Sequence, residues 1–194
     1  MKKLLIFAAA LSLLCCAPPV SRWSREYDDL IKTSPELMRV LTIENPADSL
    51  ILRTKCTELS TDEINSETFR TLGRKMLYTV KDLSQDGVGI AAPQVGISRR
   101  LIAVQRFDKQ GEPFELYANP RIISRSGEVK EGPEGCLSVP GRSGLVNRNS
   151  RIELEYTSLY SLNDTTEVIE GFTAVIFQHE CDHLEGILFT DYLR

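Results

Sequence analysis

The sequence is poor in histidine and shows no excess of basic charge. Only two histidines occur among 194 residues, and 23 Lys and Arg stand against 27 Asp and Glu, for a formal net charge of −4. This balance argues against a nucleic-acid-binding protein, which would present a basic surface. No internal repeat or low-complexity segment occurs, and the longest apolar run, residues 4–14, is too short to span a bilayer. With 42% apolar and 26% charged residues, the composition is that of one soluble globular domain.

The two histidines, His179 and His183, lie four residues apart with Glu180 between them. Residues i and i+4 share one face of an α-helix, so both imidazoles can bind one divalent metal ion. Glu180 is then close enough to exchange a proton with water at the metal, a spacing that is typical of hydrolytic metal sites. The same string can also arise by chance on a polar helix, where it would be only a solvated face.

The residues before the histidines favour a buried helix. Residues 174–177 form the apolar run Ala-Val-Ile-Phe, and Phe172 and Ile176 fall on the same helical stripe as His179. We therefore expect the metal to lie beside an apolar wall.

A catalytic zinc-type centre usually has three protein ligands and one open position, so a third ligand is needed. Glu185 lies two residues after the second histidine and should point away from the ligand face. Cys181 should project from the opposite side of the helix, and Cys56 sits in a polar stretch typical of a half-buried thiol. Cys136 lies in the glycine-bearing, turn-rich segment 133–140, where the backbone can approach a ligand. The sequence therefore predicts a Cys-His-His centre completed by Cys136.

Three short segments, taken together and in this order, are more specific than any one of them. They are Gly-Val-Gly-Ile-Ala-Ala-Pro-Gln at 87–94, Glu-Gly-Cys-Leu-Ser at 134–138 and Gln-His-Glu-Cys-Asp-His-Leu-Glu-Gly at 178–186. Together they resemble the three signature motifs of the peptide deformylases. The resemblance runs from about residue 39 to the C-terminus, which predicts a catalytic domain over residues 39–194.

The resemblance implies a role for each motif residue. Cys136 and the two histidines would bind the metal, and Glu180 would act as general base and acid. Gln94 and the Leu137 N–H would hold the oxyanion. The implied reaction is hydrolysis of the formyl group from N-formyl-methionyl peptides, with release of formate. The resemblance points to Fe²⁺ as the cofactor, whereas a Cys-His-His donor set also suits Zn²⁺.

The same segments predict how an N-formylated peptide or protein N-terminus binds. Gly89 and Gly135 lack side chains, so an extended peptide can approach the backbone and pair with it as an added strand. Many deformylases carry a basic residue where this chain has Ser143, which leaves open how the downstream part of the peptide is held. The candidates for an apolar pocket that receives the methionine side chain are Val88, Phe172, Val175 and Ile176. Each of these could instead be an ordinary core residue.

Other motif residues have structural interpretations. Gly87 is expected in a tight turn, and Gly186 is expected at a helix C-terminus. Glu134 could pair with a cation such as Arg148. Asp182 could accept a hydrogen bond from a ligand imidazole or be a surface charge.

The remaining pattern predicts an α+β fold in which mostly antiparallel strands pack around the metal-binding helix. Ser66 would cap a helix that residues 84–87 break. The apolar positions of this helix, at helical spacing, are Phe69, Leu72, Met76 and Val80. Strands are predicted at 101–104, 114–117, 152–156 and 167–170, with a turn at 163–164 before the last of them.

The N-terminus is similar to a bacterial export signal. Two lysines precede the apolar run and two cysteines follow it, with Cys16 at the position that is acylated in a lipoprotein box. We therefore predict a signal peptide over residues 1–16, a linker over residues 17–38, and an exported enzyme that contacts the membrane only through a lipid on Cys16. An uncleaved leader on a cytoplasmic enzyme is the alternative.

Two functions of other classes share some of these features. An exported metallopeptidase would use the same histidine and glutamate residues to cleave internal peptide bonds. A non-catalytic formyl-peptide-binding lipoprotein is disfavoured because Glu180 and Gln94, which turnover requires and binding does not, are both present.

Overall fold

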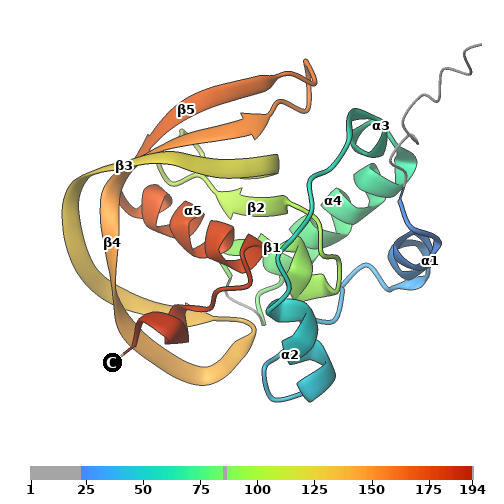
Figure 1. Ribbon diagram of the computed structural model, residues 1–194, viewed down its shortest axis with the longest axis horizontal. Coiled ribbons are helices and arrows are strands. Elements are labelled where there is room, and N and C mark those ends of the chain that lie inside the picture. The colour runs from blue at the N-terminus through green and yellow to red at the C-terminus, as the bar shows by residue number, and fades with distance from the viewer. Residues whose placement is uncertain (1–22, 85–86, 194) are drawn as a thin grey trace, which may run out of the picture.

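The computed structural model describes residues 23–84 and 87–193. The predicted signal peptide, including Cys16, lies outside the described residues, as does the first part of the predicted linker. The described chain forms one antiparallel sheet with helices packed on it (Figure 1). The predicted α+β fold class is confirmed.

Within the described residues, five strands pair in chain order and every pair is antiparallel. All the predicted strands lie within the last four, but β3 and β4, with 23 and 19 residues, are much longer than predicted. Residues 123–133 of β3 and residues 140–147 of β4 are mostly exposed, so no apolar alternation marks these stretches in the sequence. The predicted turn before the last strand ends earlier than expected, because Asp164 already pairs with Thr157. The strands are β1 (Gly89–Ala91), β2 (Leu101–Gln105), β3 (Phe114–Cys136), β4 (Val139–Thr157) and β5 (Asp164–Glu170).

The hairpin of β3 and β4 curves around helix α5 (Gly171–Leu184), as Figure 1 shows. The pairing register of the two strands shifts at several points, and β-bulges of this kind bend a strand and increase its twist. The curvature brings the tip of the hairpin back to α5. This arrangement confirms that strands pack around a central helix.

Helix α5 is buried because its apolar residues face the inside of the curved sheet. Phe177 and Leu184 are fully buried and pack with Ile152 and Leu154 of β4. Gly186 follows the last turn with a φ of 73°, the left-handed conformation in which helices commonly end. The predicted role of Gly186 is therefore confirmed.

Helix α4 (Glu67–Val80) covers the opposite face of the sheet. Leu101 and Ala103 of β2 belong to the core beneath α4, whereas Ile102 and Val104 belong to the core beneath α5. Successive residues of a strand point to opposite faces, so β2 lies between the two helices and both of them cover it.

The sequence signals for α4 are confirmed. The Ser66 hydroxyl caps the helix by accepting a hydrogen bond from the Phe69 N–H at 3.1 Å. The helix ends at Val80, before the predicted break at 84–87. All the apolar positions predicted for its buried stripe are buried: Phe69, Leu72, Met76 and Val80.

The structure differs from the predicted linker over residues 17–38, because its described part contains helix α1 (Arg25–Thr33) packed on the domain. Ile31 of this helix is fully buried. Just before the helix, Trp23 Nε1 donates to Ser66 Oγ at 2.9 Å. The helix has few apolar residues, so its burial depends on tertiary contacts that periodicity does not reveal. The shorter helices are α2 (Pro46–Leu52), α3 (Thr61–Ile64), η1 (Ala92–Val95) and η2 (Phe189–Tyr192).

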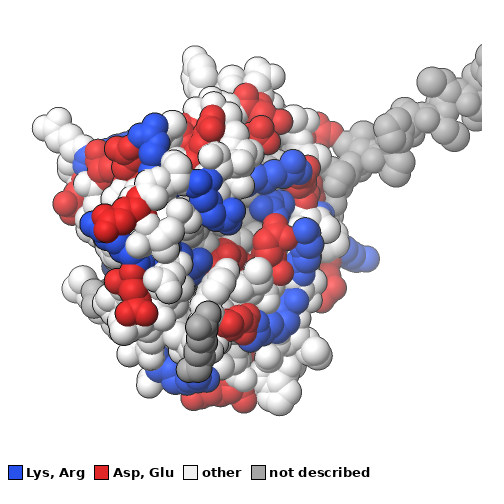
Figure 2. Space-filling model, turned by 60° about the vertical axis from the view of Figure 1, so that its left-hand side comes forward, with Lys and Arg blue, Asp and Glu red and all other residues white. Residues whose placement is uncertain are grey.

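Across the described residues, no helix is both long enough and apolar enough to cross a membrane. Acidic and basic side chains are interspersed over the face shown in Figure 2. Exposed ion pairs such as Lys55 with Glu185 contribute little to stability, so burial of the apolar cores holds the fold together.

Candidate metal centre

The structure brings Cys136, His179 and His183 together. Their ligand atoms all lie within 4.8 Å of one another, and Cys136 Sγ is 3.2 Å from His183 Nε2. Donor atoms around a tetrahedral ion, with bonds of about 2.0–2.3 Å, are separated by similar distances. The three side chains could therefore hold one divalent ion together.

Two elements position these ligands. His179 and His183 lie on successive turns of α5, with ring centroids 5.0 Å apart. Cys136 ends β3, and Leu137 and Ser138 form the two-residue turn into β4. The hairpin tip thus carries one ligand to the two on the helix.

A buried ion-pair network holds the imidazole of His179. Its Nδ1 lies 2.9 Å from Glu134 Oε2, so Nε2 is the nitrogen available to a metal. Arg148 donates to both Glu134 oxygens, at 2.7 and 3.0 Å, and to Asp182 at 2.6 Å. The predicted pair of Glu134 with Arg148 is confirmed, and Asp182 contacts the arginine rather than an imidazole.

The network also sets the charges at the site. Burial raises the pKa of Glu134, but the hydrogen bonds with His179 and Arg148 outweigh burial and bring this pKa down to about 2. Burial lowers the pKa of His179, yet its hydrogen bonds with Cys136 and Glu134 raise it to about 10. Burial and the neighbouring His179 hold the pKa of His183 well below its usual value. The carboxylate of Glu134 therefore favours positive charge at His179, whether a proton or a metal ion supplies it.

Glu180, the predicted proton carrier, is buried beside the ligands. It is 4% exposed, and its Oε2 has no hydrogen-bond partner among the described residues. Burial raises the pKa of its carboxyl to about 7. A general acid or base works best with a pKa near the working pH, so this environment suits proton transfer.

One role of Gly89 cannot be predicted from its motif. A Cβ added at this position would collide with the carboxylate of Glu180. The missing side chain therefore gives Glu180 its space, in addition to any room it leaves for a substrate. The sequence alone does not show which neighbouring side chain needs the space that a glycine leaves.

Gln94 directs an amide group toward the hairpin tip. Its Oε1 accepts from the Ala91 N–H at 2.8 Å, which fixes the orientation of the side chain. Its Nε2 lies 3.6 Å from Cys136 Sγ and 3.2 Å from Ser138 Oγ. A neutral donor thus lies between the metal ligand and the turn that contains Leu137, as an oxyanion site needs.

A cavity of about 410 Å³ lies beside the ligands. It gathers all the predicted catalytic and substrate-binding residues, while His183 is buried beneath it. Phe172 is exposed at its rim and packs on Phe107 with ring centroids 5.4 Å apart, whereas Ile176 is buried in its wall. The nearest atom to a Cβ added at Gly135 would be 3.9 Å away, so the fold itself leaves room there for a ligand backbone. The residues that line the cavity are Gly87, Val88, Gly89, Gln94, Pro133, Glu134, Gly135, Cys136, Leu137, Phe172, Val175, Ile176, His179 and Glu180.

Two other thiols in the described chain lie away from the ligand cluster. Cys56 and Cys181 line a separate hollow together with Arg100 and Glu185. Burial raises the pKa of each thiol to about 12, so neither offers a thiolate near neutral pH. The predictions that Cys181 and Glu185 point away from the metal ligands are confirmed.

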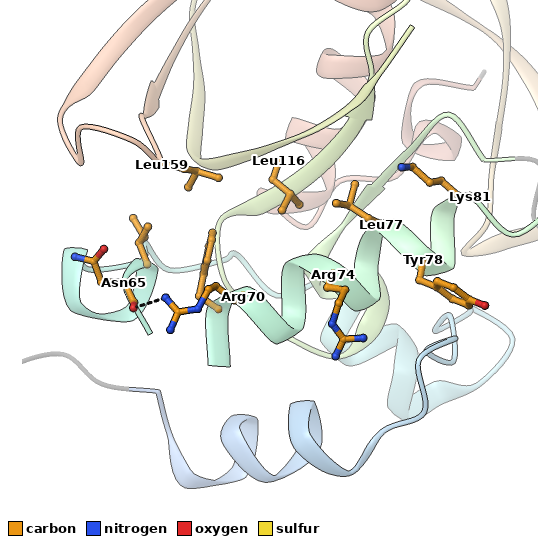
Figure 3. A pocket seen from close by; sticks show the side chains of 10 residues that line it. Asn65, Arg70, Arg74, Leu77, Tyr78, Lys81, Leu116 and Leu159 are labelled. Carbon is orange, nitrogen blue, oxygen red and sulfur yellow. Dashed lines mark hydrogen bonds between the residues drawn. The ribbon is translucent and has the colours of Figure 1, made fainter. Parts of the chain in front are cut away.

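A different groove lies between α4 and β3 (Figure 3). Its volume is about 560 Å³, and Arg70, Arg74 and Lys81 border an apolar floor that includes Leu77 and Leu116. No histidine, cysteine or carboxylate lines it among the described residues, so it has no donor set for a metal. The candidate chemistry therefore belongs to the smaller cavity beside α5.

Comparison with known proteins agrees with this assignment. The family model for polypeptide deformylase matches residues 37–194. A peptide deformylase of Leptospira biflexa serovar Patoc is 37% identical over 163 residues, which cover 80% of this chain and 87% of that protein. Peptide deformylase 2 of a Nostoc species is 40% identical over 164 residues, which cover 81% of this chain and 87% of that protein.

Solved structures are similar over the same region. The actinonin-bound class I type b peptide deformylase of Acinetobacter baumannii gives a TM-score of 0.70 at 37% identity and covers 81% of this chain and 99% of that one. The Met-Ala-Ser-bound form gives 0.70 at 36% identity, over 81% of this chain and 98% of that one. The sequence motifs, the geometry of the metal ligands and these relatives agree, and this chain belongs to the peptide deformylase family.

Proposed function

We propose that this chain is a metal-dependent hydrolase that removes the formyl group from N-formyl-methionyl peptides and releases formate. The observation that carries the proposal is the Cys-His-His cluster with the buried Glu180 beside it in one cavity. Membership of the deformylase family supports it. The Met-Ala-Ser complex of the Acinetobacter relative supports a peptide that begins with methionine.

Cys136, His179 and His183 would hold one divalent ion. The fit rests on the closeness of their donor atoms and on Glu180 Oε2, a buried oxygen that has no partner among the described residues. One thiolate and two imidazoles suit Zn²⁺ and Fe²⁺, and we propose Fe²⁺ by likeness to the family. The ion, when bound, supplies a Lewis acid that polarises the formyl oxygen and lowers the pKa of a water molecule.

Glu180 performs the proton transfers. With a pKa near 7, its carboxylate can take a proton from the attacking water and then give it to the departing amide nitrogen. The Gln94 side chain and the Leu137 N–H are neutral donors for the tetrahedral oxyanion, each worth on the order of 3 kcal/mol in comparable sites. The bond between carbon and nitrogen then breaks, leaving formate and a free N-terminal amine.

The rest of the cavity would position the peptide. The open space at Gly135 and the backbone of β1 at Gly89 allow an extended chain to pair as an added strand. The apolar wall, from Val88, Phe172, Val175 and Ile176, would receive the methionine side chain.

The cellular place of the reaction is a further part of the proposal. The lysines, short apolar run and cysteine pair at the N-terminus support an exported enzyme that a lipid on Cys16 anchors to the membrane. Such an enzyme would act on formylated peptides outside the cytoplasm.

Formate release from formyl-Met-Ala-Ser is the direct test of the activity. The purified chain is loaded anaerobically with Fe²⁺, and separately with Zn²⁺, and the two rates are compared with that of the chelated protein. We expect metal-dependent formate release and no cleavage of the corresponding N-acetylated peptide, which has no formyl group but has the same internal peptide bonds. Internal cleavage without formate release would instead indicate a metallopeptidase, and binding without any turnover would indicate a formyl-peptide-binding protein.

A further inference from the structure

An apolar groove lies against the N-terminal helix. It has a volume of about 790 Å³ and lies between α1, the segment that leads from α1 to α2, and η1. Figure 1 shows α1 and α2 flanking that segment. Leu30 and Leu37 line the groove and are each 39% exposed, so apolar surface faces solvent there. The other apolar side chains of its wall include Val40, Leu41, Ile51 and Val95.

Helix α1 is a fixed wall of this groove. Lys75 of α4 is buried and donates to the carbonyl oxygens of Ile31 and Ser34, at 2.6 and 2.5 Å. The hydroxyl of Tyr27 accepts a hydrogen bond from the Ser98 N–H at 3.2 Å. The helix precedes residues 37–194, over which the family model matches. This chain therefore adds one wall of the groove to the domain that the family shares.

The groove adjoins the catalytic cavity. Leu137, at the hairpin tip, lines both of them. The Leu41 N–H donates to the Gln94 carbonyl oxygen at 2.7 Å, and the Ile43 N–H donates to the Ser138 carbonyl oxygen at 3.0 Å. The backbone that forms the floor of the groove is thus bonded to the two segments that frame the metal ligands, so one ligand can contact both surfaces.

A peptide substrate has the length to reach the groove. An extended chain advances about 3.4 Å per residue, so residues beyond the third lie roughly 10 Å or more from the formyl group. The catalytic cavity, at about 410 Å³, accommodates only the first residues of such a chain. The substrate residues that follow must leave the catalytic cavity along a neighbouring surface. The groove beyond Leu137 is such a surface, and it would bury apolar side chains.

The charges of the groove favour an uncharged, apolar occupant. Two charged side chains line it, Glu26 and Arg39, and their charges are opposite in sign. Arg39 is already paired with Asp48, at 2.7 and 2.8 Å. We propose that this groove binds apolar side chains at the fourth to sixth positions of the substrate, so that the enzyme prefers formyl-methionyl chains that continue with apolar residues. This inference rests on the proposed deformylase function and specifies its substrate class.

The test compares two formylated hexapeptides on the full-length chain loaded with metal. Both begin formyl-Met-Ala-Ser, and they continue with three leucines or with three serines. We expect kcat/KM to be about tenfold higher for the leucine peptide, mainly through KM, which is the effect of burying part of one or two leucine side chains. Fluorescence anisotropy of the corresponding unformylated, labelled peptides should show the same preference in Kd without turnover.

The groove variant is Leu30→Ser combined with Leu37→Ser, and the single Leu37→Ser change is a milder second variant. In both, the ratio of the two kcat/KM values should fall toward one. The control is Leu50→Ser on α2, which removes a side chain that is 74% exposed and does not line the groove. This control should keep the ratio of the parent.

Three results would overturn the inference. The first is that the parent shows equal kcat/KM and equal Kd for the two peptides. The second is that both groove variants keep the preference for the leucine peptide. A change in sedimentation mass in the groove variants, with the preference intact, would assign the groove to contact between two copies of the chain. Failure to release formate from formyl-Met-Ala-Ser itself would instead count against the proposed function, and the anisotropy measurement would still decide the preference.

Discussion

Replacing Glu180 with glutamine should separate catalysis from stability more clearly than any other change in this chain. Glutamine has nearly the same shape, so it preserves the close contact with Gly89 and leaves the ligand cluster in place. It cannot carry a proton between water and the leaving amine. Loss of a general acid-base group lowers rates by about 10²–10⁴, which corresponds to roughly 3–5 kcal/mol in the activation free energy.

The same change should stabilise the metal-free protein. The folded chain holds the pKa of Glu180 at about 7, against an ordinary value of 4.5. A carboxyl group whose pKa is raised by folding lowers the free energy of unfolding at pH values above its unfolded-state pKa. For Glu180 this loss grows between pH 4.5 and 7 and then stays constant at about 3 kcal/mol. Glutamine is neutral, so the metal-free variant should exceed the parent by about that amount at pH 8 and should match it below pH 4.

The assay combines formate release, metal content and urea unfolding of the chelated protein at several pH values. The matched control is Glu185→Gln at the C-cap of the same helix, because that carboxylate pairs with Lys55 and Arg100 and does not line the cavity. The control should keep the parental rate within a few fold. Turnover of the Glu180→Gln variant close to the parental rate with full metal content would refute the assignment of Glu180 as proton carrier.

Three other experiments test further parts of the proposed function and of the structure. Cys136→Ala should lower metal content and activity together, whereas Cys56→Ala and Cys181→Ala should preserve both; metal loss in either of the latter, with Cys136→Ala unaffected, would overturn the ligand assignment. In the parent, the folded-state pKa of Glu134 is depressed to about 2, so this carboxylate stabilises the fold above pH 4.5 and the stabilisation is lost as the pH falls toward 2. Glu134→Gln should remove this stabilisation. In urea unfolding of the metal-free proteins, the difference between parent and variant should therefore shrink by about 3 kcal/mol over that window, and a constant difference would contradict the pairing. Mass spectrometry of the mature protein from an envelope fraction should find diacylglycerol on Cys16, and an intact N-terminal methionine in the cytosol would rule out the lipid anchor.

The clustering of Cys136 with His179 and His183 could be predicted from the sequence for physical reasons. The spacing of His179 and His183 is a property of one helix, and few alternatives exist when a chain has two histidines. Cys136 could be chosen because glycine-bearing turns leave the backbone accessible. Helix α4 could also be predicted, because its Ser66 cap and the helical spacing of its apolar residues are local signals.

Apart from the pair of Glu134 with Arg148, the contacts that hold the site could not be predicted in this way. Glu134 reaches His179 through a hairpin whose register is set by bulges, and neither residue signals the other in the sequence. Helix α1 has too few apolar residues to stand out, and it is fixed by the ammonium group of Lys75 from another helix. Contacts between distant segments depend on the whole fold, so local patterns do not determine them.

The pairing of Glu134 with Arg148 and His179 has a consequence for how the protein acquires its ion. These contacts tie the hairpin tip to α5 by protein atoms alone, two residues before Cys136. The donor atoms should therefore keep their relative positions when the ion departs, and reloading should require little reorganisation. Exchange of one divalent ion for another would then be governed by which ion the surroundings supply rather than by refolding of the site.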